Sequence, residues 1–182
     1  MADLMDCPAC WGTKPACKRC KGSGKVADRL LAPHFKLSEL VNSGTARKLC
    51  LANDPTPEIE KNLERLCVEA LEPIRQVVGP LRINSGYRSD AVNKAVGGST
   101  TSAHSFGLAA DLNPVKMSWK QLMDAVLASG LKLDQIIYEH TWVHVGLGHP
   151  KYKKQRGEAL TMFKRDGKMV YEPYDPNDER IA

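Results

Sequence analysis

The chain lacks the features of a membrane or a disordered protein. No stretch comes near the roughly 18 consecutive apolar residues that a membrane-spanning helix needs, so no membrane insertion is expected. The first residues hold neither a basic cluster nor an apolar run, so no secretory signal is visible and synthesis in the cytoplasm is expected. No segment is of low complexity, and 42% hydrophobic residues in 182 suffice for a packed core.

The charge balance is mildly basic. Lys and Arg number 26 against 21 Asp and Glu, which gives a formal net charge of +5. This balance favours an anionic partner such as nucleic acid, a membrane surface or a cell-wall polymer. The densest basic cluster, residues 151–156, is interpreted as a solvated loop without a functional role.

Four of the six cysteines form two pairs of equal spacing. Cys7 and Cys10 make one CxxC pair, and Cys17 and Cys20 make the second. Each pair can supply two thiolates to one ion, and four thiolates close a tetrahedral structural zinc site. Cysteines in a reducing compartment are expected as metal ligands or free thiols rather than as disulfides. The glycines after Cys20 allow a tight turn whose backbone N–H groups point at sulfur.

The first 27 residues contain few large apolar side chains and need a metal site of this kind to fold. We therefore divide the chain into a four-cysteine zinc module, residues 1–27, and a main domain, residues 28–182, whose end from about residue 150 is a hairpin and tail. The module resembles one unit of the cysteine-rich zinc region of J-domain co-chaperones. A structural clip is its simplest role, and binding of a protein, nucleic acid or wall polymer remains open. Cys50 and Cys67 are expected on helices as small core residues.

Capping signals locate two helices. Thr56 followed by Pro57 is expected to begin a helix whose apolar residues recur at helical spacing, with a kink at Pro73. Ser118 begins a capping box for a second helix, and Gly130 is its expected C-terminal stop.

Strand signals follow most of the helical ones. Residues 81–84 are expected to form a short strand, and residues 133–139 and 142–147 a tight hairpin. A second hairpin is expected within residues 162–171, around the Asp-Gly pair at 166–167. Strands and helices do not alternate regularly, so the expected class is α+β, a small antiparallel sheet flanked by helices.

Three segments concentrate the residue types of a hydrolytic metal site. They are SGYRS at residues 85–89, SAHSFGLAAD at 102–111 and YEHTWVHV at 138–145. A loop holding His104 and a strand through Asp111 can meet at one point, and strand alternation places His144 opposite its apolar neighbours. Two histidines and one carboxylate form a ligand set that leaves a zinc position open for water. Singly, each residue also fits a structural role, such as a packed histidine or a turn-capping aspartate.

These motifs resemble the zinc D-alanyl-D-alanine carboxypeptidase family, which includes phage endolysins, from about His34 to Gly148. The SxHxxGxAxD pattern is complete, and the SGYRS and WVH motifs follow the same order. The resemblance implies a hedgehog-like α+β fold whose sheet carries the catalytic zinc. It also implies that the zinc ligands are His104, Asp111 and His144.

Further roles follow from the same resemblance. Arg88 would contact the substrate carboxylate or the developing oxyanion, a task that suits a planar guanidinium. Ser102 would hydrogen-bond the substrate backbone. The general base departs from the family pattern, because Thr141 stands where much of the family has an acid. We expect Glu139 to serve instead, from a position across the hairpin from His144 if residues 140–143 form the loop.

The implied activity is zinc-dependent hydrolysis of D-amino-acid-containing bonds in peptidoglycan stem peptides, by a D,D- or L,D-specific carboxypeptidase or endopeptidase. A phage or prophage endolysin, or a virion-associated wall hydrolase with other phage proteins as partners, is the expected setting, acting after lysis or during entry. The alternative is a non-catalytic zinc-stabilised protein that binds wall, protein or nucleic acid. Thr141 keeps this alternative open, and nucleic acid is the less favoured partner.

Overall fold

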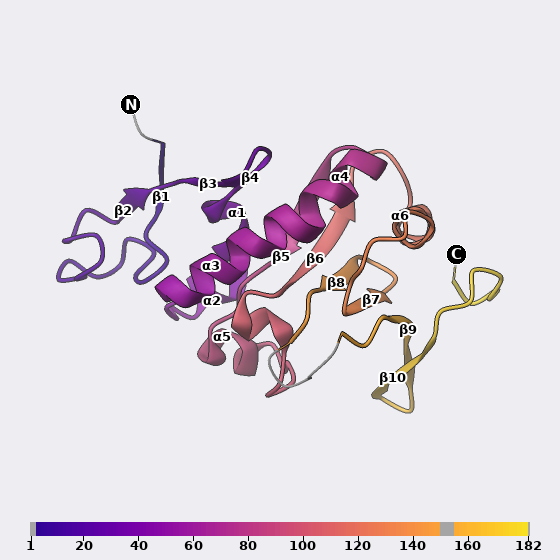
Figure 1. The fold of residues 1–182 in the computed structure, drawn as a ribbon. Helices are drawn as coiled ribbons and strands as arrows, with labels where there is room; N and C mark the ends of the chain where they lie inside the picture. The colour runs from indigo at the N-terminus through magenta and orange to yellow at the C-terminus, as the bar shows by residue number, and fades with distance from the viewer. Residues whose placement is uncertain (1–2, 150–154, 182) are drawn as a thin grey trace.

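The apolar strands collect in one six-stranded sheet of mixed α+β architecture (Figure 1). The structure is a computed structural model that describes residues 3–149 and 155–181. The strand order is β10-β9-β7-β8-β6-β5, and every neighbouring pair is antiparallel except β7 and β9. The strands are β5 (Leu81–Ser85), β6 (Ala109–Pro114), β7 (Gln135–Tyr138), β8 (Val143–Gly146), β9 (Glu158–Arg165) and β10 (Lys168–Pro173).

The α+β class and both hairpins are confirmed, and the sheet is antiparallel as expected except at one pair, β7 and β9. β8 pairs with one edge of β7 and ends beside Gln135. β9 begins beside the same residue on the other edge, so it runs parallel to β7. The β9–β10 turn has positive φ at Asp166 (49°) and Gly167 (77°), as a two-residue type I′ hairpin requires.

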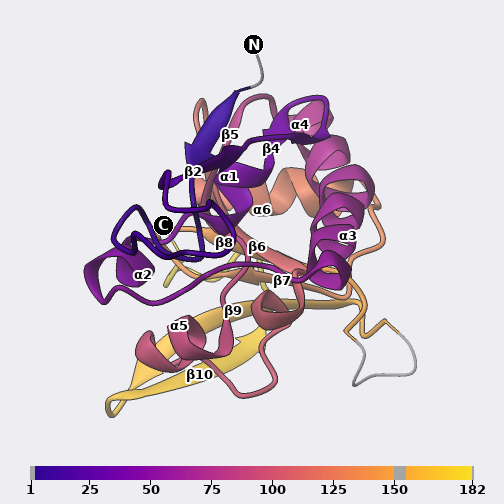
Figure 2. The same cartoon turned by 90° about the vertical axis from the view of Figure 1, so that its left-hand side faces the viewer.

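Three helical segments cover one face of the sheet, as Figure 2 shows. They are α3 (Pro57–Leu66), continued through a π-helical turn, η1 (Cys67–Leu71), into α4 (Glu72–Val78), and α6 (Trp119–Ala128). The Thr56 hydroxyl accepts from the Ile59 N–H, 3.3 Å away, which confirms the expected start of α3. Instead of a simple kink, the helix has the π-helical turn directly before the residues around Pro73, where a proline lacks its N–H donor.

Helix α6 follows its capping signals. The Ser118 hydroxyl accepts from the Gln121 N–H at 3.2 Å, and the Gln121 side chain accepts from the Ser118 N–H at 2.9 Å. Gly130 has a φ of 70° just after the helix, so the expected left-handed stop is confirmed.

The lone cysteines have different environments. Cys67 is fully buried in η1, as expected, and burial raises the pKa of its thiol to about 12. The prediction for Cys50 is wrong: its side chain is exposed. Helix α2 (Gly44–Lys48) ends before Cys50, which sits in a turn with a φ of 51° and so leaves the packed face.

The N-terminal segment folds around its cysteines at one end of the molecule (Figure 1). β1 (Leu4–Asp6) pairs with β2 (Lys25–Ala27) and closes it, and β3 (Leu30–Ala32), β4 (Phe35–Lys36) and α1 (Leu37–Val41) follow. The four cysteines form a buried cluster separate from the main core. The domain boundary at residue 27 stays a prediction.

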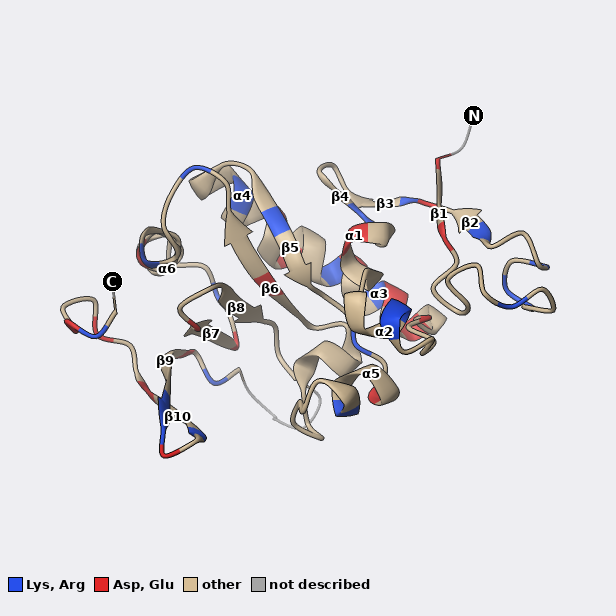
Figure 3. Cartoon of the chain, turned by 180° about the vertical axis from the view of Figure 1, so that it is seen from behind, with Lys and Arg blue, Asp and Glu red and all other residues tan. Residues whose placement is uncertain are grey.

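Basic and acidic positions are interspersed in the N-terminal segment and the C-terminal hairpin (Figure 3). Ion pairs join them, such as Lys25 to Asp6 at 2.6 Å and Arg165 to Glu172 at 2.7 Å. Most of the basic cluster expected at 151–156 lies outside the described residues. Among the residues that are described, no helix has the length and apolar character needed to cross a membrane.

Candidate metal centre and active site

The two faces of the sheet have different side chains. On one face, residues such as Leu112, Val143 and Val145 pack into the main core under the helices. Alternation along the strands sends Asp111 of β6 and His144 of β8 to the opposite face. These two residues are direct partners in the β6–β8 register, so their side chains lie side by side.

His104 completes a triangle with this pair. It lies on η2 (Ala103–Phe106), a 3₁₀ turn just before β6. His104 Nε2 is 3.2 Å from Asp111 Oδ1 and 3.2 Å from His144 Nδ1, and the latter two atoms are 3.0 Å apart. All three side chains are buried, and the neighbouring imidazoles lower the pKa of Asp111 although burial alone would raise it.

The triangle fits one face of a zinc coordination tetrahedron. With bonds of about 2.0–2.1 Å to nitrogen and oxygen, such a tetrahedron has edges of about 3.3 Å. The three observed distances, 3.0–3.2 Å, are close to this value. Three donors leave a fourth position, which is the arrangement of a catalytic rather than a structural zinc.

Neighbouring groups orient the three donors. His104 Nδ1 is 2.6 Å from the Gly86 carbonyl oxygen, and because a carbonyl only accepts, Nδ1 carries the proton and Nε2 presents its lone pair. Arg88 donates to the other oxygen of Asp111, with 2.5 Å between its Nη2 and Oδ2. The Arg88 Nε–H in turn donates to the Ser85 hydroxyl at 2.8 Å.

Gly107 allows the chain to reverse direction between η2, which carries His104, and β6. Its φ is 67°, a left-handed conformation that glycine adopts without strain. A Cβ here would lie 2.9 Å from the Ile59 carbonyl oxygen, so glycine is also needed for the approach of η2 to α3. The Asn62 side chain of α3 donates to the Phe106 carbonyl at 2.9 Å and fixes the turn that carries His104.

A cavity of about 380 Å³ opens over the triangle. Three residues expected to act on substrate, Arg88, Ser102 and Glu139, line it together with the triangle. This volume is in the range of pockets that hold small molecules or a few residues of a peptide. The other lining residues include Gly97, Gly98, Ser99, Thr101, Ala103, Gln135, Ile137, Trp142, His149, Arg156 and Tyr171.

Glu139 reaches the cavity by a different register from the one expected. His144 lies opposite Ile137, and the Glu139 N–H donates to the Trp142 carbonyl at 3.0 Å, so the turn spans residues 139–142. Glu139 is therefore not across from His144, but two residues beyond Ile137 on the same face of the sheet. Burial raises the pKa of the Glu139 carboxyl, and the nearby Asp111 raises it further. His144 and Arg88 act in the opposite direction but do not outweigh burial.

Other residues of this hairpin point elsewhere. His140 has a φ of 62°, and its Nε2 lies 2.8 Å from the Met162 carbonyl oxygen of β9. Thr141 is exposed in the turn. Neither residue is among those that line the cavity.

Sequence reasoning missed part of the cavity wall. Tyr171 comes from β10, and Gln135, His149 and Arg156 come from β7 and the segment between β8 and β9. Arg156 is anchored by the buried carboxylate of Asp134, at 2.6 Å. No motif includes these residues, because they reach the cavity only through the pairing of β9 with β7 and of β10 with β9.

The cysteine cluster forms a second candidate centre. Cys7 Sγ is 3.9 Å from Cys17 Sγ, and Cys10 Sγ is 3.7 Å from Cys20 Sγ. A tetrahedron with Zn–S bonds of about 2.3 Å has edges of about 3.8 Å, so four thiolates fit one ion. All four ligand atoms lie within 4.8 Å of one another, which leaves no open position.

The thiols of this cluster differ in acidity. Burial raises the pKa of Cys7 to about 12. Burial acts the same way on Cys20, but hydrogen bonds from the backbone of Gly24 and Gly22, together with those to neighbouring thiols, lower its pKa to about 7. The expected glycine-rich turn therefore does aim N–H groups at a sulfur, which favours the thiolate that zinc binds.

Two centres predict two zinc ions per chain. We expect Cys10→Ser to remove one of them, because a serine hydroxyl replaces one of four thiolates, while the His104 centre keeps its ion. Elemental analysis of purified protein measures the zinc content, and Cys50→Ser, at an exposed cysteine outside both clusters, is the matched control. A wild-type chain that binds one ion and loses none in Cys10→Ser would contradict the cysteine centre.

Fold and site together define a metallohydrolase architecture: an α+β domain with an open three-donor centre at the floor of a cavity. Comparison with family sequence models identifies the family. The Peptidase M15 model matches residues 33–146, more than half of the chain, and the protein belongs to this family of zinc-dependent peptidases. No curated protein matches the chain. The matched span includes all three donors of the triangle but excludes the cysteine cluster and the β9–β10 hairpin.

Proposed function

We propose that this protein hydrolyses D-amino-acid-containing peptide bonds of bacterial peptidoglycan. The observation that carries the proposal is the buried triangle of His104, Asp111 and His144 at the floor of a cavity. Membership of the Peptidase M15 family supports peptidase chemistry, and the mildly basic charge balance suits an anionic wall polymer.

The triangle residues would hold the catalytic zinc. When bound there, zinc supplies Lewis acidity, which polarises a carbonyl group and lowers the pKa of a water molecule toward neutrality. His104 offers Nε2 because its Nδ1 proton is committed to Gly86, and Arg88 fixes the orientation of the Asp111 carboxylate. Because the His104 tautomer and the Asp111 carboxylate are already fixed, these side chains would need to move little when zinc binds.

Glu139 is the proposed general base. Its carboxylate lines the same cavity, and its raised pKa suits a group that both accepts and returns a proton near neutral pH. Glu139 takes a proton from the attacking water and delivers it to the leaving amine. The water oxygen forms a bond to the scissile carbonyl carbon, and the C–N bond breaks. The proton that Glu139 takes from the water is the one that it returns to the amine.

Arg88 and Ser102 are the proposed substrate contacts. The Arg88 guanidinium has five N–H donors, and its contacts to Asp111 and Ser85 still leave donors for an oxyanion or a substrate carboxylate. Ser102 lies at the cavity wall just before the turn that carries His104, where its hydroxyl can meet a substrate backbone.

The specificity is part of the proposal only at the level of class. The substrate is a stem peptide, cut by a D,D- or L,D-specific carboxypeptidase or endopeptidase, and the setting is a phage or prophage endolysin or a virion-borne wall hydrolase. Mass analysis of the released fragments identifies the bond that is cut. Clearing of permeabilised cells, compared with intact cells to which protein is added from outside, separates a lysis role from an entry role.

Purified peptidoglycan incubated with the protein, with and without a chelator, tests the activity. We expect new free amines, no new reducing sugar ends, and loss of the amines with the chelator. Appearance of reducing ends instead would identify a glycosidase and contradict the proposal. Wall binding without new amines would support the non-catalytic alternative, and salt-sensitive retardation of DNA would support the nucleic-acid alternative.

A further inference from the structure

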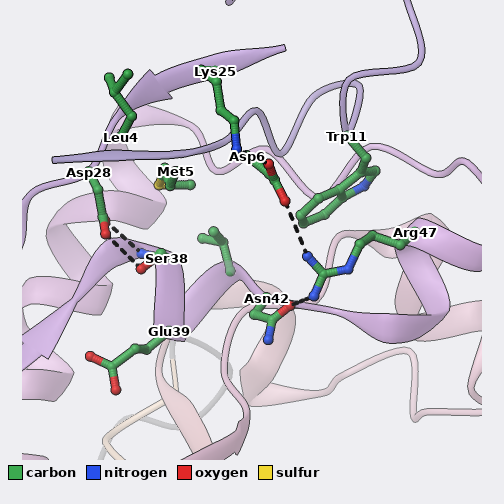
Figure 4. Close-up of a pocket in the computed structure, with 11 residues that line it drawn as sticks. Leu4, Met5, Asp6, Trp11, Lys25, Asp28, Ser38, Glu39, Asn42 and Arg47 are labelled. Atoms are coloured by element: carbon green, nitrogen blue, oxygen red, sulfur yellow. Dashed lines mark hydrogen bonds and ion pairs between the residues drawn. The ribbon is translucent and has the colours of Figure 1, made fainter.

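The cysteine cluster is packed against the main domain rather than tethered to it. A cavity of about 380 Å³ lies at this junction, between β1, β2 and helices α1 and α2 (Figure 4). Its polar groups are already paired with one another: Arg47 contacts Asn42 and Asp6, and Asp28 receives hydrogen bonds from Ser38. The Arg47 guanidinium also stacks over the Trp11 ring, 5.2 Å from its centroid. Because these groups are paired, we interpret the cavity as part of the interface between the cysteine cluster and the main domain, and we call this interface the seam.

Beside this seam, the cysteine turns hold residues 51–54, which we call the docking segment. The Asn53 N–H donates to the carbonyl of Pro8, inside the first CxxC pair, at 2.8 Å. The Trp11 indole N–H donates to the Leu51 carbonyl, also at 2.8 Å. Arg19, inside the second CxxC pair, forms an ion pair with Asp54 at 2.9 Å. Both cysteine turns therefore contact the same four residues.

The other side of the docking segment holds the loop of residues 86–89. The Asn53 side chain is fully buried, and its amide nitrogen donates to the Val41 carbonyl at 2.9 Å and the Tyr87 carbonyl at 3.0 Å. Its amide oxygen accepts from the Ser89 N–H at 2.8 Å. Asn53 thus fixes the backbone on both sides of Arg88, and its side chain donors and acceptor are all in use.

The same loop touches the candidate metal centre at two points. The Gly86 carbonyl accepts the Nδ1 proton of His104, and the Arg88 N–H donates to the His104 carbonyl at 3.2 Å. A Cβ on Gly86 would lie 2.4 Å from the Leu40 carbonyl oxygen, so the loop is also pressed against α1. Any shift of this loop therefore moves both the guanidinium of Arg88 and the ring of His104.

We infer that the four-cysteine cluster is a positioning element for the active site, and that Asn53 is the residue through which it acts. The path runs from Pro8 between the first two cysteines, through the backbone and side chain of Asn53, to the loop that carries Arg88. Closing of the cysteine turns on a metal fixes the Pro8 carbonyl and so the docking segment. The expected change in kcat rests on the proposed peptidase function. The expected change in amide hydrogen exchange does not.

The first test weakens the docking without changing a residue that lines the active-site cavity. The double variant Trp11→Phe/Arg19→Ala removes the hydrogen bond from Trp11 to Leu51 and the ion pairs of Arg19 with Asp54 and with Glu60 of α3. Lys18→Ala, an exposed neighbour, is the matched control. We expect the double variant to lower kcat by about 10-fold, because small misplacements of a catalytic group cost about that much or more. Its zinc content should equal that of wild type, because all seven ligand residues remain.

Amide hydrogen exchange supplies the readout that does not depend on activity. Exchange of residues 86–92 should speed up in Trp11→Phe/Arg19→Ala and in Cys10→Ser, and stay at the wild-type rate in Lys18→Ala. A cysteine cluster that merely folds the N-terminus would leave this exchange unchanged, and that result in the folded double variant would overturn the inference. Changed exchange in a chain without hydrolysis would instead contradict the proposed function alone.

A double-mutant cycle tests the route through Asn53. Asn53→Ala alone should lower kcat strongly, and adding Trp11→Phe/Arg19→Ala to it should cost little more, because both changes interrupt one path. Full additivity would show that the cluster does not act through Asn53. If Asn53→Ala does not fold, Pro8→Gly, which loosens the first cysteine turn, replaces it in the cycle and is judged by the same exchange measurement.

Discussion

Replacing Glu139 by glutamine is expected to leave zinc bound and to lower kcat on wall peptides by about 10²–10⁴-fold, the range for loss of a general base. Glutamine keeps the size and the hydrogen-bonding ability of the side chain but cannot accept the proton. The carboxylate is not one of the triangle donors, so the metal centre should stay intact. Elemental analysis and a free-amine assay on the same preparation measure the two quantities.

The pH profile gives a second reading of the same variant. Burial raises the pKa of Glu139, and a base works only when deprotonated, so wild-type activity should fall as the pH drops through that raised value. Glu139→Gln should lack this acidic limb. Glu172→Gln, at a partly buried glutamate of β10 that does not line the cavity, is the control and should keep both rate and limb. Full lytic activity in Glu139→Gln would remove Glu139 from the mechanism without touching the metal centre.

His144→Ala is expected to lose both the zinc of the triangle and all measurable hydrolysis. Two donors, His104 and Asp111, would remain where an open zinc centre uses three from the protein. Zinc content should fall from two ions to one per chain, because the cysteine cluster is untouched. His140→Ala, in the same hairpin but turned toward β9, is the matched control and should keep both ions.

The two variants separate binding from chemistry. Loss of activity with zinc retained in Glu139→Gln, and loss of both in His144→Ala, would assign the residues to different tasks. Hydrolysis by a His144→Ala protein that binds only one ion would show that the triangle is not the catalytic centre. The cysteine cluster would then be the remaining metal centre among the residues that the structure describes.

Local signals in the sequence predicted local structure well. The Thr56 and Ser118 caps, the Gly130 stop and the Asp-Gly hairpin each depend on a few neighbouring residues, and each is confirmed. The parallel pairing of β7 with β9 could not be read in this way, because it depends on which edge of β7 is free. Cys50 was misjudged for a related reason: one residue decides whether a position is in the helix or in the turn after it.

In the candidate site too, the residues within motifs could be predicted, whereas the features that depend on tertiary structure could not. Spacing left open whether His104, Asp111 and His144 meet, and it was the family resemblance that joined them. Their convergence depends on the turn at Gly107 and on the β6–β8 register, both tertiary features. Glu139 was expected opposite His144 but lies opposite Trp142, because the hairpin loop consists of residues 140–141 rather than 140–143. Tyr171 was missed because it comes from β10, beyond the motifs.

The direct pairing of Asp111 with His144 has a consequence for assembly of the sheet. Side chains alternate along each strand, so a slip of either strand by one residue would turn its own donor, Asp111 or His144, into the apolar interior and would expose the adjacent core residue, Leu112 or Val143, to water. Misaligned chains would lose the ion and the core together. A metal ion that bound to Asp111 and His144 would therefore stabilise only the chain in which these two strands are correctly aligned.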